Sequence, residues 1–122
     1  MNWEKPCGYD DAQKTLFHST ARTRLKRLAA ELGLPAGSYD LRSNKAGVAV
    51  SGEVTLHHDQ VYIQVGQSCM GAGMGVLIRT CRGRRDFTGG MNNFAPLALL
   101  DDLPALAERV RRIAPQLGRR AA

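Results

Sequence analysis

Residues 48–65 contain two neighbouring runs in which apolar and polar side chains alternate, and this alternation constrains the fold most. Because a β-strand places successive side chains on opposite faces, each run predicts a strand with one buried face. A two-residue turn at His58-Asp59 would join the runs as an antiparallel hairpin in which Leu56 pairs with Val61. That register puts every aliphatic residue of the two runs on one face: Val48, Val50, Val54, Leu56, Val61, Ile63 and Val65.

Gly52 interrupts the first run without changing its parity. We therefore interpret residues 48–58 as one long strand that is bent or bulged at Gly52. The alternative is two strands joined by a turn at Ser51-Gly52, since a two-residue loop that contains glycine is a hairpin signal.

Further strands are predicted on both sides of this hairpin. Residues 39–42 form a short strand that ends in the turn-forming residues Ser43-Asn44-Lys45. A glycine-rich connection at 66–75 leads to residues 76–81, which are apolar on both faces at first and so predict a strand near the centre of the sheet.

Two helices are predicted outside the strands. The first runs from about Asp11 to Leu32, where Asp10 or Asp11 caps its start and Gly33 and Pro35 end it. Its apolar stripe has helical spacing and consists of Phe17, Ala21, Leu25, Leu28, Ala29 and Leu32.

The second helix is shorter and begins after Asp101 or Asp102, with Pro104 in its first turn. Pro115 and Gly118 end it. Its apolar stripe consists of Leu103, Leu106, Ala107, Val110 and Ile113.

These elements predict an α+β fold: an antiparallel meander of three or four strands, flanked by a long N-terminal helix and a short C-terminal helix. Strands that follow one another with short links pair antiparallel, and no alternation of strand and crossover helix is present. The length of 122 residues suits a single domain over residues 1–122. We expect residues 1–10 to form an irregular lead-in and residues 115–122 a frayed tail.

Charge and composition limit the partners. The chain carries 17 Lys and Arg against 11 Asp and Glu, a formal charge of +6, which favours nucleic acid or an acidic protein as partner. No apolar run approaches the roughly 20 residues that span a bilayer, and the N-terminal segment lacks the pattern of a signal peptide. With three widely spaced cysteines and no zinc-type spacing, we expect a cytoplasmic protein without a metal or cofactor.

The stretch Arg82–Phe94 is the strongest candidate for a binding site. Glycines allow a ligand to approach the backbone, and free amides beside guanidinium groups suit phosphate or carboxylate. The alternative for the Asp-x-Thr-Gly-Gly segment is an Asx-stabilised turn without a ligand. The candidate residues in this stretch are Arg82, Arg84, Arg85, Asp86, Thr88, Asn92 and Asn93.

Tyr62 and His57 are further candidates, since they fall on the polar face of the central hairpin, where an aromatic ring among hydrogen-bonding groups can stack a base. The alternative is an ordinary solvent-exposed sheet face. No residue stands out as catalytic, because no acid–base pair or nucleophile has a recognisable setting.

Two functional hypotheses follow. The favoured one is a non-enzymatic binding module that contacts nucleic acid or an acidic protein surface through its basic residues. The other is a small ligand-binding protein or enzyme with an anion-binding site in the Arg82–Asn93 loop. The residues that would bind the anionic ligand are Arg84, Arg85, Asp86 and Asn92.

The segments YDLRSN, AVSGEVTLH and GRRDFTGGMNNF, between Tyr39 and Phe94, resemble small uncharacterised bacterial proteins of plasmids and integrated elements. The likeness covers about half of the chain. It implies an accessory role in a mobile element and no particular activity or site residues.

Overall fold

Within the described residues, five strands form one antiparallel sheet in the order β1-β2-β3-β4-β5, so each strand pairs with its neighbour in the chain. The structure is a computed structural model that describes residues 1–3, 5–7, 10–45, 51–67 and 71–118. The helices are α1 (Asp11–Glu31) and α2 (Leu103–Ile113), with 3-10 turns η1 (Ala72–Met74), η2 (Leu97–Asp101) and η3 (Pro115–Gly118). The strands are β1 (Tyr39–Asn44), β2 (Glu53–His58), β3 (Val61–Gly66), β4 (Val76–Thr80) and β5 (Asn93–Ala95).

The α+β class and the antiparallel order are confirmed, but the sheet has five strands in the described part of the chain and not three or four. The fifth strand is β5, which pairs through Ala95 with Val76 and through Asn93 with Ile78. A strand of three residues is too short to show an alternation, and its first residue is a turn former. Neither helix of the described residues is long and apolar enough to cross a membrane.

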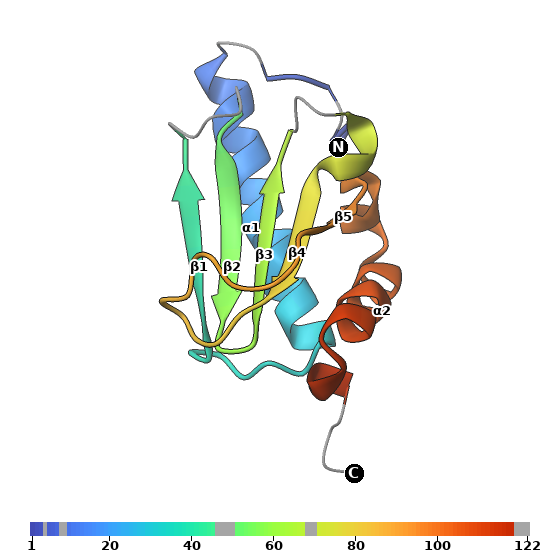
Figure 1. The fold of residues 1–122 in the computed structure, drawn as a ribbon. Helices are drawn as coiled ribbons and strands as arrows, with labels where there is room; N and C mark the ends of the chain where they lie inside the picture. The colour runs from blue at the N-terminus through green and yellow to red at the C-terminus, as the bar shows by residue number, and fades with distance from the viewer. Residues whose placement is uncertain (4, 8–9, 46–50, 68–70, 119–122) are drawn as a thin grey trace.

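Both helices cover the same face of the sheet (Figure 1): α1 runs behind the strands, and α2 lies beside β4 and β5. The core fills the space between these layers. Its largest side chains include Phe17, Leu25, Leu28, Leu56, Ile63, Ile78, Leu97, Leu100 and Leu106. We call the other face of the sheet the outer face, and none of the helices in the described residues lies on it.

Helix α1 forms as its pattern predicts. The Asp10 carboxylate accepts hydrogen bonds from the backbone amides of Ala12 (3.0 Å) and Gln13 (3.2 Å), two of the donors that a helix start leaves free. Leu32 is the C-cap, and Gly33 follows with φ +75°. The predicted stripe is buried: Phe17, Ala21, Leu25, Leu28, Ala29 and Leu32.

Helix α2 is capped by Asp102, whose carboxylate accepts from the amide of Ala105 at 3.3 Å. Leu106, Ala107 and Val110 are buried. The predicted frayed tail is wrong for its first part, because Pro115–Gly118 forms η3 and places Leu117 in the core. Residues 119–122 lie outside the described residues.

The register predicted for the central hairpin is wrong. Leu56 pairs with Ile63 and not with Val61, so the turn between β2 and β3 is Asp59-Gln60. The observed pairing moves the partner of Leu56 by two residues, and an even shift leaves the same side chains on the buried face. The alternation therefore identifies the face but not the turn.

The first strand of that hairpin begins later in the chain than the preferred interpretation predicts. β2 starts at Glu53, which pairs with Asn44 of β1, so Ser51 and Gly52 belong to the connection between these strands. Gly52 has φ +74°, and a Cβ there would overlap the carbonyl oxygen of Asn44. Both versions of the predicted strand also include residues 48–50, which lie outside the described residues.

Candidate functional site

The connection between β4 and β5, residues 81–92, crosses the outer face of the sheet, and we call it the strap. In Figure 1 it passes in front of β3 and β2 and reaches β1 before it returns to β5. The face that it crosses is lined by every second residue of each strand, as the pairing of Arg42 with Thr55 and of Tyr62 with Arg79 shows. The predicted alternative of an ordinary exposed face is therefore wrong under the strap, where Thr55, His57 and Tyr62 are buried.

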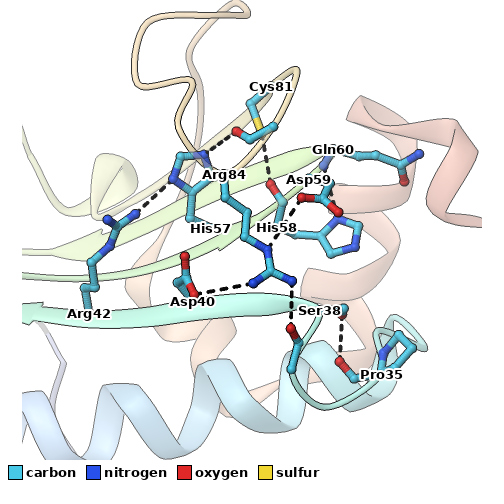
Figure 2. A network of polar contacts seen from close by, with 12 residues as sticks. Pro35, Ser38, Asp40, Arg42, His57, His58, Asp59, Gln60, Cys81 and Arg84 are labelled. Atoms are coloured by element: carbon cyan, nitrogen blue, oxygen red, sulfur yellow. Dashed lines mark hydrogen bonds and ion pairs between the residues drawn. The ribbon is translucent and has the colours of Figure 1, made fainter.

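Arg84 holds the strap to three other segments (Figure 2). Its guanidinium lies 3.5 Å from a carboxylate oxygen of Asp40 in β1 and 3.5 Å from one of Asp59 in the turn after β2. It also donates a hydrogen bond to the carbonyl oxygen of Gly37 at 2.7 Å. Arg84 was predicted to bind an external anion, and its donors are instead engaged within the protein.

His57 forms the second attachment of the strap. Its Nε2 lies 2.9 Å from the carbonyl oxygen of Gly83, and its Nδ1 lies 3.0 Å from Nη2 of Arg42. A guanidinium can only donate, so Nδ1 accepts and Nε2 carries the proton that goes to Gly83. Burial lowers the pKa of His57, and the charge of Arg42 acts in the same direction.

Asp86 organises the strap from within. Its carboxylate accepts hydrogen bonds from the backbone amides of Arg82 (3.0 Å), Thr88 (3.2 Å) and Gly89 (2.9 Å). These bonds hold the pKa of Asp86 below its usual value. This is the Asx-stabilised turn that the sequence offers as the alternative to a ligand site.

A cluster of rings and guanidinium groups joins the strap to the sheet. The Phe87 ring packs edge-on against His57 (5.2 Å between centroids) and lies 5.2 Å from the guanidinium carbon of Arg42. Beneath it, the guanidinium of Arg79 lies 4.4 Å from the centre of the Tyr62 ring. Phe87 itself remains 51% exposed, so one large apolar surface of the strap faces solvent.

The strap also encloses a hollow of about 700 Å³, open to solvent. Within the described residues, the side chains of Arg82 and Arg85 make no hydrogen bond or ion pair, and both residues are exposed. Their charges are therefore available to an anion. The hollow is lined by Thr80, Cys81, Arg82, Gly83, Arg85, Asp86, Thr88, Gly89 and Gly90.

Cys81 does not have the setting of a catalytic thiol. Its Sγ donates to the carbonyl oxygen of His58 at 3.1 Å, and burial raises its pKa. A raised pKa lowers the fraction of the reactive thiolate. In the part of the chain that the structure describes, no three His, Cys, Asp or Glu side chains gather as a metal site would require.

The structure brings most of the candidate residues to one place. The strap carries Arg82, Arg84, Arg85, Asp86, Thr88 and the exposed Asn92, and the sheet beneath it carries His57 and Tyr62. Asn93 has a structural position, since it donates to the carbonyl oxygens of Ile78 and Met91.

The cluster also contains three residues that were not candidates from the sequence: Arg42, Arg79 and Phe87. The position of Arg79 could be predicted, because it lies in the strand predicted at 76–81. Its pairing with Tyr62 could not, because it depends on a register that the alternation leaves open. Phe87 carried no such signal, since nothing local shows that the strap folds back over the sheet.

Comparison with protein-family models, with characterised proteins and with solved structures gave no match. The function must therefore be argued from the site itself.

Proposed function

We propose that the protein is a non-enzymatic binding module for single-stranded nucleic acid, with the strap as its contact surface. One observation carries the proposal: Arg82 and Arg85, whose side chains have no partner among the described residues, lie on the same short segment as the half-exposed ring of Phe87. Cationic groups that follow the backbone, together with aromatic rings on which bases stack, are the means by which proteins bind single strands.

A single strand suits this surface better than a duplex. Phe87 offers a ring face to a base, and a base in a duplex already has both of its faces stacked. Reading a duplex in its major groove takes a helix or a two-stranded ribbon, and the strap is neither.

The formal charge of +6 supports the same partner, because a basic protein attracts phosphates over a distance. Each phosphate that an arginine neutralises releases a counterion, so binding should weaken steeply as salt rises.

A small anion is the second candidate ligand, and the hollow beside Arg82 and Arg85 favours it. Thr80 and Thr88 add hydroxyl groups to its lining, to which Gly89 and Gly90 also belong. Phosphate or pyrophosphate would then compete with the nucleic acid for the same guanidinium groups.

The test is a fluorescence-anisotropy titration with labelled single-stranded and duplex oligonucleotides at low and moderate salt. We expect the single strand to bind more tightly, and the double variant Arg82→Gln/Arg85→Gln to weaken it by about tenfold or more at low salt. Phe87→Leu, which keeps an apolar side chain without a ring, should weaken it by a factor of about five or more.

A matched control removes the same charge elsewhere. Lys26 and Arg27 are exposed on α1 and, within the described residues, make no ion pair, so Lys26→Gln/Arg27→Gln tests net charge alone and should change affinity far less. Equal losses in the two double variants would contradict a site at the strap. Absence of binding to any oligonucleotide would overturn the proposal, and binding of polyglutamate or pyrophosphate would then point to an acidic protein or a small anion.

A further inference from the structure

A second, smaller hollow of about 240 Å³ lies on the outer face, beside the strap and away from Arg82 and Arg85. Phe87 forms one wall, and the sheet provides the others from β1, β2 and β3. We call it the slot. It is lined by Arg42, Asn44, Glu53, Thr55, Tyr62 and Phe87.

Phe87 gives the slot an apolar wall of the kind on which a base stacks. The ring already contacts His57 and Arg42, so its position does not depend on a ligand. Its half-exposed surface remains available to a second ring. Tyr62 contributes less ring surface, because it is almost fully buried and Arg79 lies over its ring.

Glu53 gives the slot a hydrogen-bond acceptor. The residue is partly buried and, in the described part of the chain, its carboxylate forms no hydrogen bond or ion pair, although Arg42 also lines the slot. Arg42 instead donates to His57 and lies against Phe87. Without a partner, this carboxylate would repel the phosphates that the basic residues attract. A nucleic acid that binds here must therefore offer the carboxylate a hydrogen-bond donor.

The edges of the four bases differ in what they offer a carboxylate. Guanine presents two adjacent donors, N1–H and the N2 amino group, which match the two oxygens of a carboxylate in the way that a guanidinium does. Cytosine and adenine present one amino group each, next to an acceptor nitrogen. Thymine and uracil present one N–H between two carbonyl oxygens, which a carboxylate repels.

We propose that the slot is a nucleobase site that selects guanine, with the base stacked on Phe87 and its N1–H and N2 amino groups donating to Glu53. This inference rests on the proposed binding of single strands and adds to it a preference for one base. Arg82 and Arg85 supply affinity without regard to sequence, and Glu53 supplies the discrimination.

The test uses short thymidine oligonucleotides in which one central position is guanine, inosine, adenine, cytosine or thymine. We expect guanine to bind the full-length protein about tenfold more tightly than thymine. Inosine keeps N1–H but lacks the amino group, so its affinity should fall between the two. Glu53→Gln offers only one acceptor and no charge, and it should reduce the preference for guanine to about twofold or less.

Glu31→Gln is the matched control, because it removes the same charge from an exposed position on α1. It should leave the preference for guanine unchanged. Circular dichroism of the Glu53 variant checks that the sheet is intact.

The outcomes separate the two proposals. If the wild-type protein binds all five oligonucleotides equally, the slot does not read a base and the inference is wrong, while the proposed function stands. A preference for guanine that Glu53→Gln leaves intact places the reading elsewhere and also overturns the inference. If no oligonucleotide binds at all, the proposed function itself fails.

Discussion

Arg84 and Arg85 are neighbours in the chain with opposite surroundings. Arg84 contacts Asp40, Asp59 and the carbonyl oxygen of Gly37, whereas Arg85 makes no ion pair or side-chain hydrogen bond within the described residues. In the proposed function these adjacent arginines therefore have different roles. Arg84 attaches the strap to the sheet, and Arg85 is available to a ligand.

This difference predicts opposite effects of two alanine substitutions. Arg84→Ala should lower the free energy of unfolding by about 1 kcal/mol, a modest loss because the ion pairs are partly solvent-exposed. Arg85→Ala should change it by less than about 0.5 kcal/mol while it weakens binding of a single strand. Urea denaturation measures the first effect and anisotropy the second. A larger stability loss from Arg85→Ala than from Arg84→Ala would show that these assignments are reversed.

At the scale of the element, the strap depends on one histidine being neutral. Protonated His57 could no longer accept the hydrogen bond from Arg42, and its charge would lie beside that of Arg42. Its pKa in the folded protein is lowered from the ordinary value of 6.5. The unfolded chain therefore takes up this proton first as the pH falls.

We accordingly expect the free energy of unfolding to be insensitive to His57 above pH 6.5 and to decrease as the pH falls from there toward the lowered pKa of the folded state. Urea denaturation between about pH 7.5 and about pH 5 measures this slope. His57→Gln can still accept from Arg42 and donate to Gly83, but it takes up no proton, so its slope should be shallower. His58, whose pKa is also lowered, is present in both proteins and cancels in the comparison. Identical slopes would contradict the role of His57.

Elements with a regular pattern could be predicted from the sequence, and those defined by long-range pairing could not. α1 was predictable because its cap and its apolar stripe are local. The register of β2 and β3 was not, since shifting the partner by two residues preserves the faces and leaves only the turn to decide. β5 has three residues and depends on β4 for its pairing.

The candidate site divides in the same way. The arginines and glycines of the strap could be recognised from the sequence, and so could the turn around Asp86. The composition does not show that the strap folds back over the sheet. That direction depends on the contact between Arg84 and Asp40, which is 44 positions earlier in the chain. The sequence therefore indicated where a candidate site lies, but not that Phe87 and Arg42 lie together beside His57.

At the scale of the whole molecule, Trp3 of the predicted irregular lead-in is part of the core. Trp3 is only 3% exposed and packs edge-on against Phe17, with 5.8 Å between ring centroids. Gln67 holds the segment in place, since its side chain donates to the carbonyl oxygen of Trp3 and accepts from the amide of Cys7. The first residues of the chain thus fix one end of the two-layer structure.

Trp3→Ala should therefore lower the free energy of unfolding by about 3 kcal/mol, as the loss of a buried aromatic side chain does. Urea denaturation followed by circular dichroism measures it. Leu16→Ala is the control from the same end of the molecule: Leu16 is 51% exposed, and its truncation should cost less than about 1 kcal/mol. A loss below about 1 kcal/mol for Trp3→Ala would mean that the lead-in contributes little to the core.

The order of the strands has a consequence for how the chain folds as it is made. Each strand pairs with the strand before it, so the sheet can assemble step by step with short loops to close. Trp3 can accept its hydrogen bond from Gln67 only after more than 60 further positions have been added. The end of α1 can accept from Arg111 only after 80 further positions. During synthesis on a ribosome, the apolar stripe of α1 therefore remains incompletely covered until α2 has emerged. Helix α1 precedes every strand in the chain, yet it completes its contacts only after the sheet has been made.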